Sequence, residues 1–265
     1  MKKPSPSERK ASEKVELEVS TGPQERPHRI LIYGTGGIGK STLAGWLPAP
    51  LFLDDESGTS LLDVHRMDCP DWHTMKGAIA ALQANPPKKY RTIVIDTVTR
   101  LQKLCELWIL ENRGKTPVGS IEEFPWGKGW QFLHEEMVNL LADLDRLVER
   151  GFNVCLIAHD VSVSVPNPGG EDWLRWEPDL YSGTKQGRGN VQGFVKGWAD
   201  HILAVMYDVD THNGKGQGDG DRFIHTMERP QYIAKTRASE ALPSYEFTAD
   251  DPGAIWIKLG ISKPS

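Results

Sequence analysis

The chain contains little cysteine, since only Cys69, Cys105 and Cys155 occur among its 265 residues and no CxxC pair is present. Three cysteines spaced far apart argue against a disulfide framework and against a cysteine-based zinc site. A reducing cytosol is therefore the compartment that we expect for this protein.

Long apolar runs are also missing, because no segment approaches the ~20 residues that a membrane-spanning helix needs. The N-terminal stretch MKKPSPSERKASEKVELEVS lacks the apolar region of a secretory signal. Apolar residues make up 38% of the chain and charged residues 25%, which is typical of a soluble globular protein. We expect no membrane partner, and the length suits one domain with a substantial core.

An excess of positive charge is the third thing that the sequence lacks, since its formal net charge is −5. The field of the whole protein therefore does not attract a polyanion, and any contact with nucleic acid requires a local basic surface. Residues 1–27 are rich in Lys, Glu, Ser and Pro and predict a flexible N-terminal tail, which leaves residues 28–265 as the folded core. Within that tail, VELEV (15–19) alternates like a strand, so pairing of this segment is the alternative.

The remaining sequence alternates two kinds of segment. Continuous apolar runs typical of buried strands occupy residues 29–33, 50–56, 91–96, 152–158 and 201–209. Helical patterns occupy residues 41–47, 71–84, 97–114 and 128–150. This alternation predicts an α/β fold with a mostly parallel central sheet that helices cover on both faces.

The pattern changes after residue 160. Residues 162–193 are rich in Pro, Gly, Asn and Ser and predict a long functional loop. Beyond strand 201–209, residues 222–227 and 231–237 predict antiparallel strands, and the apolar segments 245–247 and 254–260 complete the chain. We therefore expect an antiparallel C-terminal extension of the sheet.

The stretch GTGGIGKS fits the phosphate-loop pattern G-x-x-x-x-G-K-[ST] between a predicted strand and a predicted helix. Glycines let several backbone N–H groups point at one anion, and the N-terminus of the following helix adds a partial positive charge. The lysine of the pattern reaches the β- and γ-phosphates, and its hydroxyl residue is a ligand of Mg²⁺. We predict that ATP phosphates bind residues 34–42, namely Gly34, Thr35, Gly36, Gly37, Ile38, Gly39, Lys40, Ser41 and Thr42, with Ser41 also at the metal.

Polar residues stand where three other predicted strands end. Asp96 ends RTIVID, where an acid beside a phosphate loop holds Mg²⁺; the alternative is a helix cap. PLFLDDE ends in Asp54, Asp55 and Glu56, which offer a carboxylate for the attacking water or are simply solvated loop acids. His159 ends FNVCLIAH and either senses the γ-phosphate or is a partly exposed strand end.

Several families share a phosphate loop. GTGGIGKST superficially resembles the KGGxGKST loop of the ParA/MinD ATPases, but Thr35 stands where that family has its first lysine. The arginine-rich lid typical of small-molecule kinases has no counterpart in the sequence, and we locate no acceptor pocket for such a kinase.

The order of the motifs resembles the core of the RecA/RadA recombinases. In that family a strand of the pattern F-I-D-x-E carries the catalytic glutamate, and FLDDE matches it at Glu56. The family's Walker B strand corresponds to RTIVID with Asp96, and its γ-phosphate sensor, often glutamine, corresponds to His159. A Gly-Asn segment follows at Gly189-Asn190.

A last match concerns cations. The family's K-x-[KR] pattern, whose cations reach the nucleotide of the neighbouring subunit, corresponds to AKTR with Lys235 and Arg237. The resemblance spans about residues 29–260 and leaves no room for the extra domains of RecA or RadA. Such a core is most similar to phage-type RecA-core single-strand annealing ATPases, which are described as phage nucleotide-binding or AAA-type ATP-binding proteins.

This resemblance implies a RecA-like P-loop ATPase that binds ATP and Mg²⁺ and forms a homo-oligomer, either a ring or a filament. It also implies single-stranded DNA as a partner, a role in annealing or homologous recombination, a single-strand binding protein as a further partner, and the cytoplasm of a bacterial or phage-infected cell. The alternative is a nucleotide-switched loader that recruits a partner and has no annealing activity.

The segment KQGRGNVQGFVKG (185–197) contains cations, glycines and one aromatic residue but no acid. Cations with an aromatic side chain suit single-stranded nucleic acid, because bases stack on the ring while the cations follow the backbone. The alternative is a surface loop whose aromatic residue packs on the body of the protein. The residues that we predict to bind DNA are Lys185, Arg188, Phe194 and Lys196.

Overall fold

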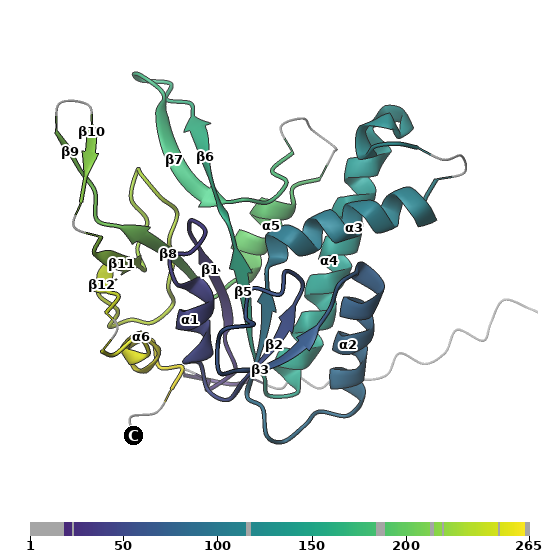
Figure 1. The fold of residues 1–265 in the computed structure, drawn as a ribbon, viewed down its shortest axis with the longest axis horizontal. Helices are drawn as coiled ribbons and strands as arrows, with labels where there is room; N and C mark the ends of the chain where they lie inside the picture. The colour runs from purple at the N-terminus through teal and green to yellow at the C-terminus, as the bar shows by residue number, and fades with distance from the viewer. Residues whose placement is uncertain are drawn as a thin grey trace, which may run out of the picture.

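The computed structural model describes residues 19–22, 24–114, 118–183, 189–212, 215–218, 220–248 and 250–262. An eight-stranded sheet in the order β12-β11-β8-β1-β5-β4-β2-β3 forms its centre (Figure 1). The strands of this sheet are β1 (Arg29–Tyr33), β2 (Pro50–Asp54), β3 (His65–Asp68), β4 (Thr92–Asp96), β5 (Asn153–Ala158), β8 (His201–Tyr207), β11 (Arg222–His225) and β12 (Ser244–Glu246).

Two further pairs of strands lie outside the sheet, namely β6 (Asp160–Val165) with β7 (Trp173–Pro178) and β9 (Asp210–His212) with β10 (Lys215–Gln217). The helices are α1 (Lys40–Gly45), α2 (Trp72–Ala84), α3 (Val98–Asn112), α4 (Lys128–Glu149), α5 (Val191–Trp198) and α6 (Ala254–Lys258), with short 3-10 turns η1 (Ile121–Glu123) and η2 (Pro125–Gly127).

The sheet is parallel from β8 to β3 and antiparallel where β11 and β12 extend it. β1 lies between β5 and β8, so Ile30 is in register with Cys155 on one side and with His201 on the other. The central strands are almost wholly buried, as their continuous apolar sequences predict. The predicted α/β class, with a mostly parallel sheet and an antiparallel C-terminal extension, is confirmed.

Helices cover both faces of the sheet. One core joins α2, α3, α4 and α5 to the face of β1 that carries Leu31 and Tyr33. The other joins α1 and α6 to the opposite face, which carries Ile30 and Ile32. Alternate residues of one strand point to opposite faces, so β1 supplies both cores.

Helix α1 packs against residues from the C-terminal part of the chain. The indole N–H of Trp256 in α6 donates a hydrogen bond of 3.0 Å to the carbonyl of Leu43, and Trp256 is fully buried. Phe247, which follows β12, is buried in the same core. The helix that follows the phosphate loop therefore packs on elements that come late in the sequence.

The structure differs from the sequence expectations, or adds to them, in four places. Residues 162–193 are not one loop, because β6 and β7 form a hairpin that rises above the sheet in Figure 1 and α5 begins at Val191. Residues 254–258 form helix α6, and β3 lies at the edge beyond β2. Segment 231–237 forms isolated bridges, such as Lys235 with Ile202, where a continuous strand is expected.

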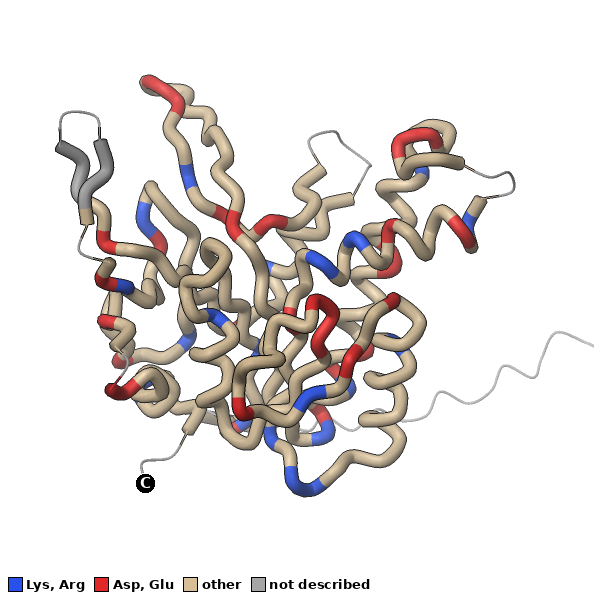
Figure 2. Tube along the Cα trace, viewed as in Figure 1, with Lys and Arg blue, Asp and Glu red and all other residues tan. Residues whose placement is uncertain are grey.

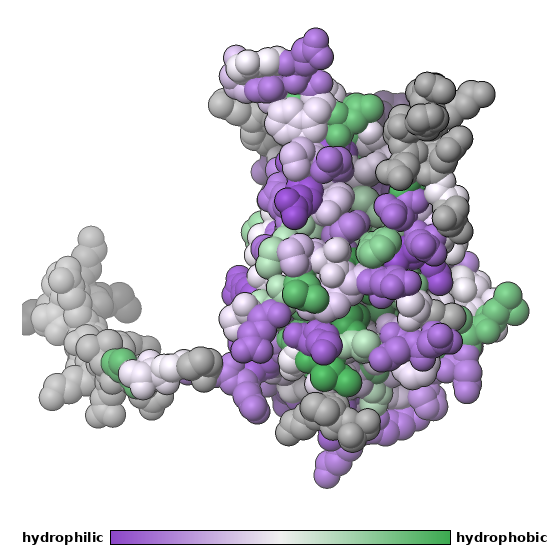
Figure 3. Space-filling view, turned by 90° about the vertical axis from the view of Figure 1, so that its left-hand side faces the viewer, coloured by the Kyte–Doolittle hydropathy of each residue, from purple (hydrophilic) through white to green (hydrophobic). Residues whose placement is uncertain are grey.

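Across the described part of the chain, no helix is both long and apolar enough to cross a membrane. Figure 3 looks onto the side that carries β11, β12 and α6, where small apolar patches lie among polar side chains.

Candidate functional site

The parallel strands bring the predicted site residues to one edge of the sheet. The phosphate loop follows β1, the three acids stand at the end of β2, Asp96 ends β4 and His159 follows β5. Asp54 is in register with Asp96, and Asp96 with Ile157. The carboxyl ends of parallel strands meet at one edge, which is where ligands bind in folds of this class.

The phosphate loop has the backbone that its glycines predict. Gly37 and Gly39 have φ angles of 77° and 107°, which side chains rarely allow. Gly34 is required for space, since a Cβ at this position would lie 2.2 Å from the carbonyl oxygen of Val205. The loop therefore passes close over the end of β8.

Lys40 is buried at the start of α1 and lies over its own loop. Its ammonium donates to the carbonyl oxygens of Gly34 and Thr35 at 2.7 and 2.9 Å. Burial lowers the pKa of Lys40, while Asp160, Asp96 and Glu56 oppose that shift. A buried ammonium at a glycine-rich loop that opens a helix is suited to binding phosphate oxygens.

Ser41 and Asp96 are in direct contact. The Ser41 hydroxyl donates a hydrogen bond of 2.6 Å to the Asp96 carboxylate, which joins α1 to the end of β4. Burial raises the pKa of Asp96 to about 6, and the Ser41 hydrogen bond opposes the rise. A buried carboxylate beside a hydroxyl is a donor set that a hard divalent cation accepts.

The three acids after β2 have different surroundings. Asp54 is buried and accepts hydrogen bonds from the backbone N–H groups of Glu56 and Thr59 and from the Thr59 hydroxyl. Asp54 therefore shapes the turn. Asp55 accepts from the Thr97 N–H at 2.7 Å, and its other oxygen is buried without a partner among the described residues. Burial raises the pKa of Asp55 to about 8.

Glu56 is the member of this acidic segment that reaches toward solvent; Figure 2 shows the segment in red after β2. Its carboxylate accepts a hydrogen bond of 3.1 Å from the Thr97 hydroxyl and lies 3.5 Å from Nε2 of His159. The side chains of Glu56 and His159 are 35% and 36% exposed. The structure thus places Glu56 and His159 together at the open side of the site.

Three residues beside the site were not predicted from the sequence. Thr97 holds both Asp55 and Glu56, and Thr99 accepts a hydrogen bond of 3.0 Å from the backbone N–H of His159. Asp160 is close enough to Lys40 to affect its pKa. Thr97 and Thr99 follow the predicted Walker B acid in the sequence. Their position beside that motif could have identified them as residues of the site.

Lys235 and Arg237 lie at the opposite edge of the sheet. Lys235 pairs with Ile202 near the start of β8 and donates to the carbonyl of Lys196 at 2.7 Å. Arg237 forms an ion pair of 3.1 Å with buried Asp200, which Arg26 also contacts at 2.7 Å. Within one chain these two cations are therefore remote from the phosphate loop, which follows the other end of β1.

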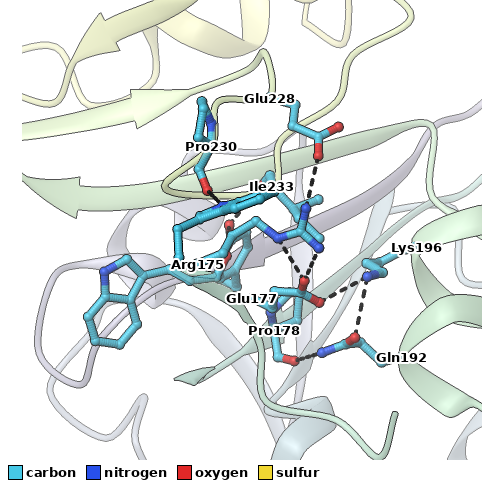
Figure 4. Close-up of polar contacts among 11 residues, drawn as sticks. Arg175, Glu177, Pro178, Gln192, Lys196, Glu228, Pro230 and Ile233 are labelled. Atoms are coloured by element: carbon cyan, nitrogen blue, oxygen red, sulfur yellow. Dashed lines mark hydrogen bonds and ion pairs between the residues drawn. The ribbon is translucent and has the colours of Figure 1, made fainter. Parts of the chain in front are cut away.

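The predicted DNA-binding residues are only partly described. Lys185 and Arg188 lie outside the described residues, and Phe194 on α5 is 46% exposed. Lys196 forms an ion pair of 3.0 Å with Glu177, whose side chain is 5% exposed and also binds Arg175 (Figure 4). In the view of Figure 2, the positive charges of the described residues are scattered and form no broad basic face. Their binding of DNA stays a prediction.

The site fits Mg²⁺ better than a metal held by protein ligands alone. Among the described residues, no group of three or more His, Cys, Asp or Glu side chains could hold an ion. Mg²⁺ usually keeps several waters and binds one or two carboxylates together with phosphates of the substrate. The donors Ser41 and Asp96, which are in contact beside the loop, match that preference.

Comparison with known proteins adds a family. Residues 26–238 match the AAA domain family. A comparison with curated proteins found no match. Among solved structures, the chain is similar to a crystal structure of the RadB recombinase at 13% identity and a TM-score of 0.46. That similarity covers 84% of this chain and 89% of that chain, and at this level it carries no argument about activity.

Proposed function

Because the chain belongs to the AAA domain family, we propose that it is an Mg²⁺-dependent ATPase with a RecA-type core that assembles on single-stranded DNA. The observation that carries the ATPase proposal is the hydrogen bond of 2.6 Å between Ser41 and Asp96, beside a phosphate loop with buried Lys40. This contact unites the two motifs that a P-loop NTPase needs for its metal.

Each residue of the site then has a role. Backbone N–H groups of the loop and the Lys40 ammonium bind the phosphates, and Lys40 exchanges its bonds with Gly34 and Thr35 for phosphate oxygens. Ser41 and Asp96 hold the metal, which neutralises charge on the phosphates when it is bound.

Hydrolysis needs a carboxylate that orients or deprotonates the attacking water. Glu56 suits that task because it is partly exposed, while Asp54 and Asp55 are buried and face the protein. The Thr97 hydroxyl fixes one carboxylate oxygen of Glu56, and His159 lies beside the other. His159 is thereby placed to respond to the presence of the γ-phosphate. It can transmit the state of the nucleotide to the β6–β7 hairpin, which follows it in the chain.

The position of Lys235 and Arg237 supports a proposal of assembly. Both lie at the edge of the sheet opposite the phosphate loop, so they reach a nucleotide only when another subunit supplies it. A head-to-tail ring or filament brings these two edges together, and a heterologous contact of this kind repeats along the assembly. ATP would then bind between subunits.

Single-stranded DNA is the proposed partner at segment 185–197 and at the hairpin. Trp173 and Leu174 on β7 are 36% and 69% exposed. Exposed aromatic rings offer stacking platforms for bases without sequence preference. Repetition of a weak site along an assembly gives avidity that one acidic chain lacks. Annealing or homologous recombination is the proposed outcome.

The test measures ATP hydrolysis with and without single-stranded DNA, with Lys40→Ala as the inactive variant. Lys103→Ala is the matched control, since Lys103 is an exposed lysine of α3 that pairs with Glu106. We expect Mg²⁺-dependent turnover that DNA stimulates, loss of turnover in Lys40→Ala and normal turnover in the control. Equal turnover in Lys40→Ala and wild type would refute an ATPase at this loop.

The second candidate is a nucleotide-switched loader that recruits a partner protein and does not anneal DNA. The ion pair between Lys196 and Glu177 favours this candidate, because it occupies one of the cations predicted to bind DNA. If this candidate is correct, single-stranded DNA does not stimulate ATP hydrolysis. The protein also does not shift the electrophoretic mobility of DNA in the presence of ATP and Mg²⁺.

A further inference from the structure

We propose that a cavity beside the phosphate loop binds the purine base of the nucleotide. The inference rests on the proposed function, since it concerns the nucleotide whose phosphates the loop holds. The cavity has a volume of about 830 Å³ and includes Thr35 and Ile38 of the loop in its wall. The rest of its lining comes from the end of β8, the base of the β6–β7 hairpin and residues 225–232.

The surroundings of the loop leave few directions for a base. Toward β2 and β4 the loop faces Glu56 and Asp96, which suit metal and water rather than an apolar ring. At Gly39 it is closely packed against Phe247 and the start of β11, because a Cβ on Gly39 would lie 2.8 Å from Phe247 and 3.0 Å from Arg222. The cavity at Thr35 and Ile38 lies on the remaining side, beside the end of β8.

Aromatic rings line this cavity. The rings of His225 and Tyr232 are stacked with centroids 4.2 Å apart at an angle of 17°, and the Tyr232 hydroxyl lies 3.1 Å from Nδ1 of His225. Trp176, 43% exposed, is a third ring in the wall. Flat aromatic groups held by stacking and a hydrogen bond are prepared to stack on a base. Burial lowers the pKa of His225, which favours a neutral ring.

Polar groups at the edge of the cavity fit the amino group of a purine. The carboxylates of Asp160 and Asp208 and the side-chain amide of Gln231 offer oxygen acceptors. The wall of the cavity mixes these polar groups with aromatic and aliphatic side chains, and a concave pocket that combines the two is the usual form of a small-molecule site. The cavity is also large enough to take the ribose with the base.

The experiment compares the binding of ATP and of inorganic tripolyphosphate in the presence of Mg²⁺, by calorimetry. Tripolyphosphate carries the phosphates without base or ribose, so it reports on the loop alone. In Tyr232→Ala we expect ATP affinity to fall about tenfold, because one stacking partner is lost. Tripolyphosphate affinity should stay at the wild-type level.

Two further variants separate stacking from folding. Trp126→Ala removes an indole that is 93% exposed and lies outside the cavity, so it should bind ATP as the wild type does. Tyr232→Phe keeps the ring and loses only the hydroxyl, so its ATP affinity should lie closer to that of the wild type than to that of Tyr232→Ala. A parallel loss of ATP and tripolyphosphate in Tyr232→Ala would overturn the proposal, as would unchanged ATP affinity in both Tyr232→Ala and Trp176→Ala.

The wild-type protein distinguishes failure of the base site from failure of the proposed function. If it binds tripolyphosphate and binds ATP no more tightly, the base site is wrong and the phosphate site stands. If it binds neither compound, the proposed nucleotide function is wrong and the base site falls with it.

Discussion

Ser41 and Asp96 are 55 positions apart in the sequence, and their side chains form a hydrogen bond of 2.6 Å. The contact joins the first turn of α1 to the end of β4, which lies two strands away from β1 with β5 between them. The loop that carries the phosphate-binding lysine is thereby tied to the strand that carries the buried acid.

Substitution of Ser41 by alanine should weaken the response to Mg²⁺. The variant loses the hydroxyl that we propose as a metal ligand and leaves Asp96 without its hydrogen-bond donor. We expect the Mg²⁺ concentration for half-maximal hydrolysis to rise about 10- to 100-fold. A titration of hydrolysis with Mg²⁺ measures this, with Ser162→Ala on exposed β6 as control. An unchanged titration curve would contradict the metal role.

Glu56→Gln should separate binding from hydrolysis. The amide keeps the size and the contact with Thr97 but does not accept a proton from water. We expect hydrolysis to fall about 10²- to 10⁴-fold while ATP affinity is retained. Single-turnover kinetics and equilibrium binding measure the two quantities, and Glu111→Gln on the exposed side of α3 is the control. Full turnover in Glu56→Gln would show that a group other than Glu56 activates the attacking water.

The stability of the protein should fall as pH rises through the range set by Asp55. Burial raises the pKa of this carboxyl from 3.8 to about 8, so between these values the folded state binds more protons than the unfolded state. Its free energy of unfolding therefore decreases with rising pH in that window. Asp55→Asn keeps the bond from Thr97 and removes the charge.

We expect Asp55→Asn to be more stable than the wild type by about 1–3 kcal/mol at pH 9, with a smaller difference at pH 5. Urea denaturation at the two pH values measures it. Asp63→Asn, at an exposed position, should change neither value. A wild type that loses no more stability than Asp55→Asn between pH 5 and pH 9 would show that Asp55 is not protonated in the fold.

Two glycines of the phosphate loop should tolerate alanine differently. A Cβ on Gly34 would lie 2.2 Å from the Val205 carbonyl oxygen, whereas a Cβ on Gly36 has no atom within 4 Å. We expect Gly34→Ala to lower the free energy of unfolding by about 1–3 kcal/mol and Gly36→Ala to change it by less than about 0.5 kcal/mol. Thermal unfolding without nucleotide gives both values, and equal stability of the two variants would disprove the close approach.

Arg237→Ala tests the cation supplied by a neighbouring subunit. We expect ATP binding to persist and hydrolysis to fall about 10³-fold or more, because an arginine acting on the transition state contributes that much. Arg26→Ala is the matched control, since Arg26 shares the same carboxylate oxygen of Asp200. Normal turnover in Arg237→Ala, or an equal loss in Arg26→Ala, would indicate a structural ion pair instead.

The sequence predicts the central sheet because its central strands are buried on both faces and consist mainly of apolar residues, as in RTIVID. It predicts the loop and Asp96 because a motif and a strand end specify their positions. The β6–β7 hairpin is missed although Val161, Val163 and Val165 alternate with serines. The Pro and Gly residues between its strands dominate the local pattern and indicate a loop.

Partners of charged side chains are the part that the sequence does not predict. Lys196 reads as a free cation in a segment without acids, yet it pairs with Glu177 from β7. The sequence also does not predict at which edge of the sheet Arg237 lies. That position depends on the pairing of its segment with the start of β8, through Lys235 and Ile202. Both facts come from tertiary packing between segments far apart in the chain, which composition and spacing do not specify.

The hydrogen bond from Trp256 to Leu43 has a consequence for where the domain can be cut. The family match ends at residue 238, before β12, Phe247 and α6. A fragment that stops there would expose the apolar side of α1, including Leu43 and Ala44, to water. The boundary of the shared family therefore lies inside the packed core, because residues beyond it cover the helix that follows the phosphate loop.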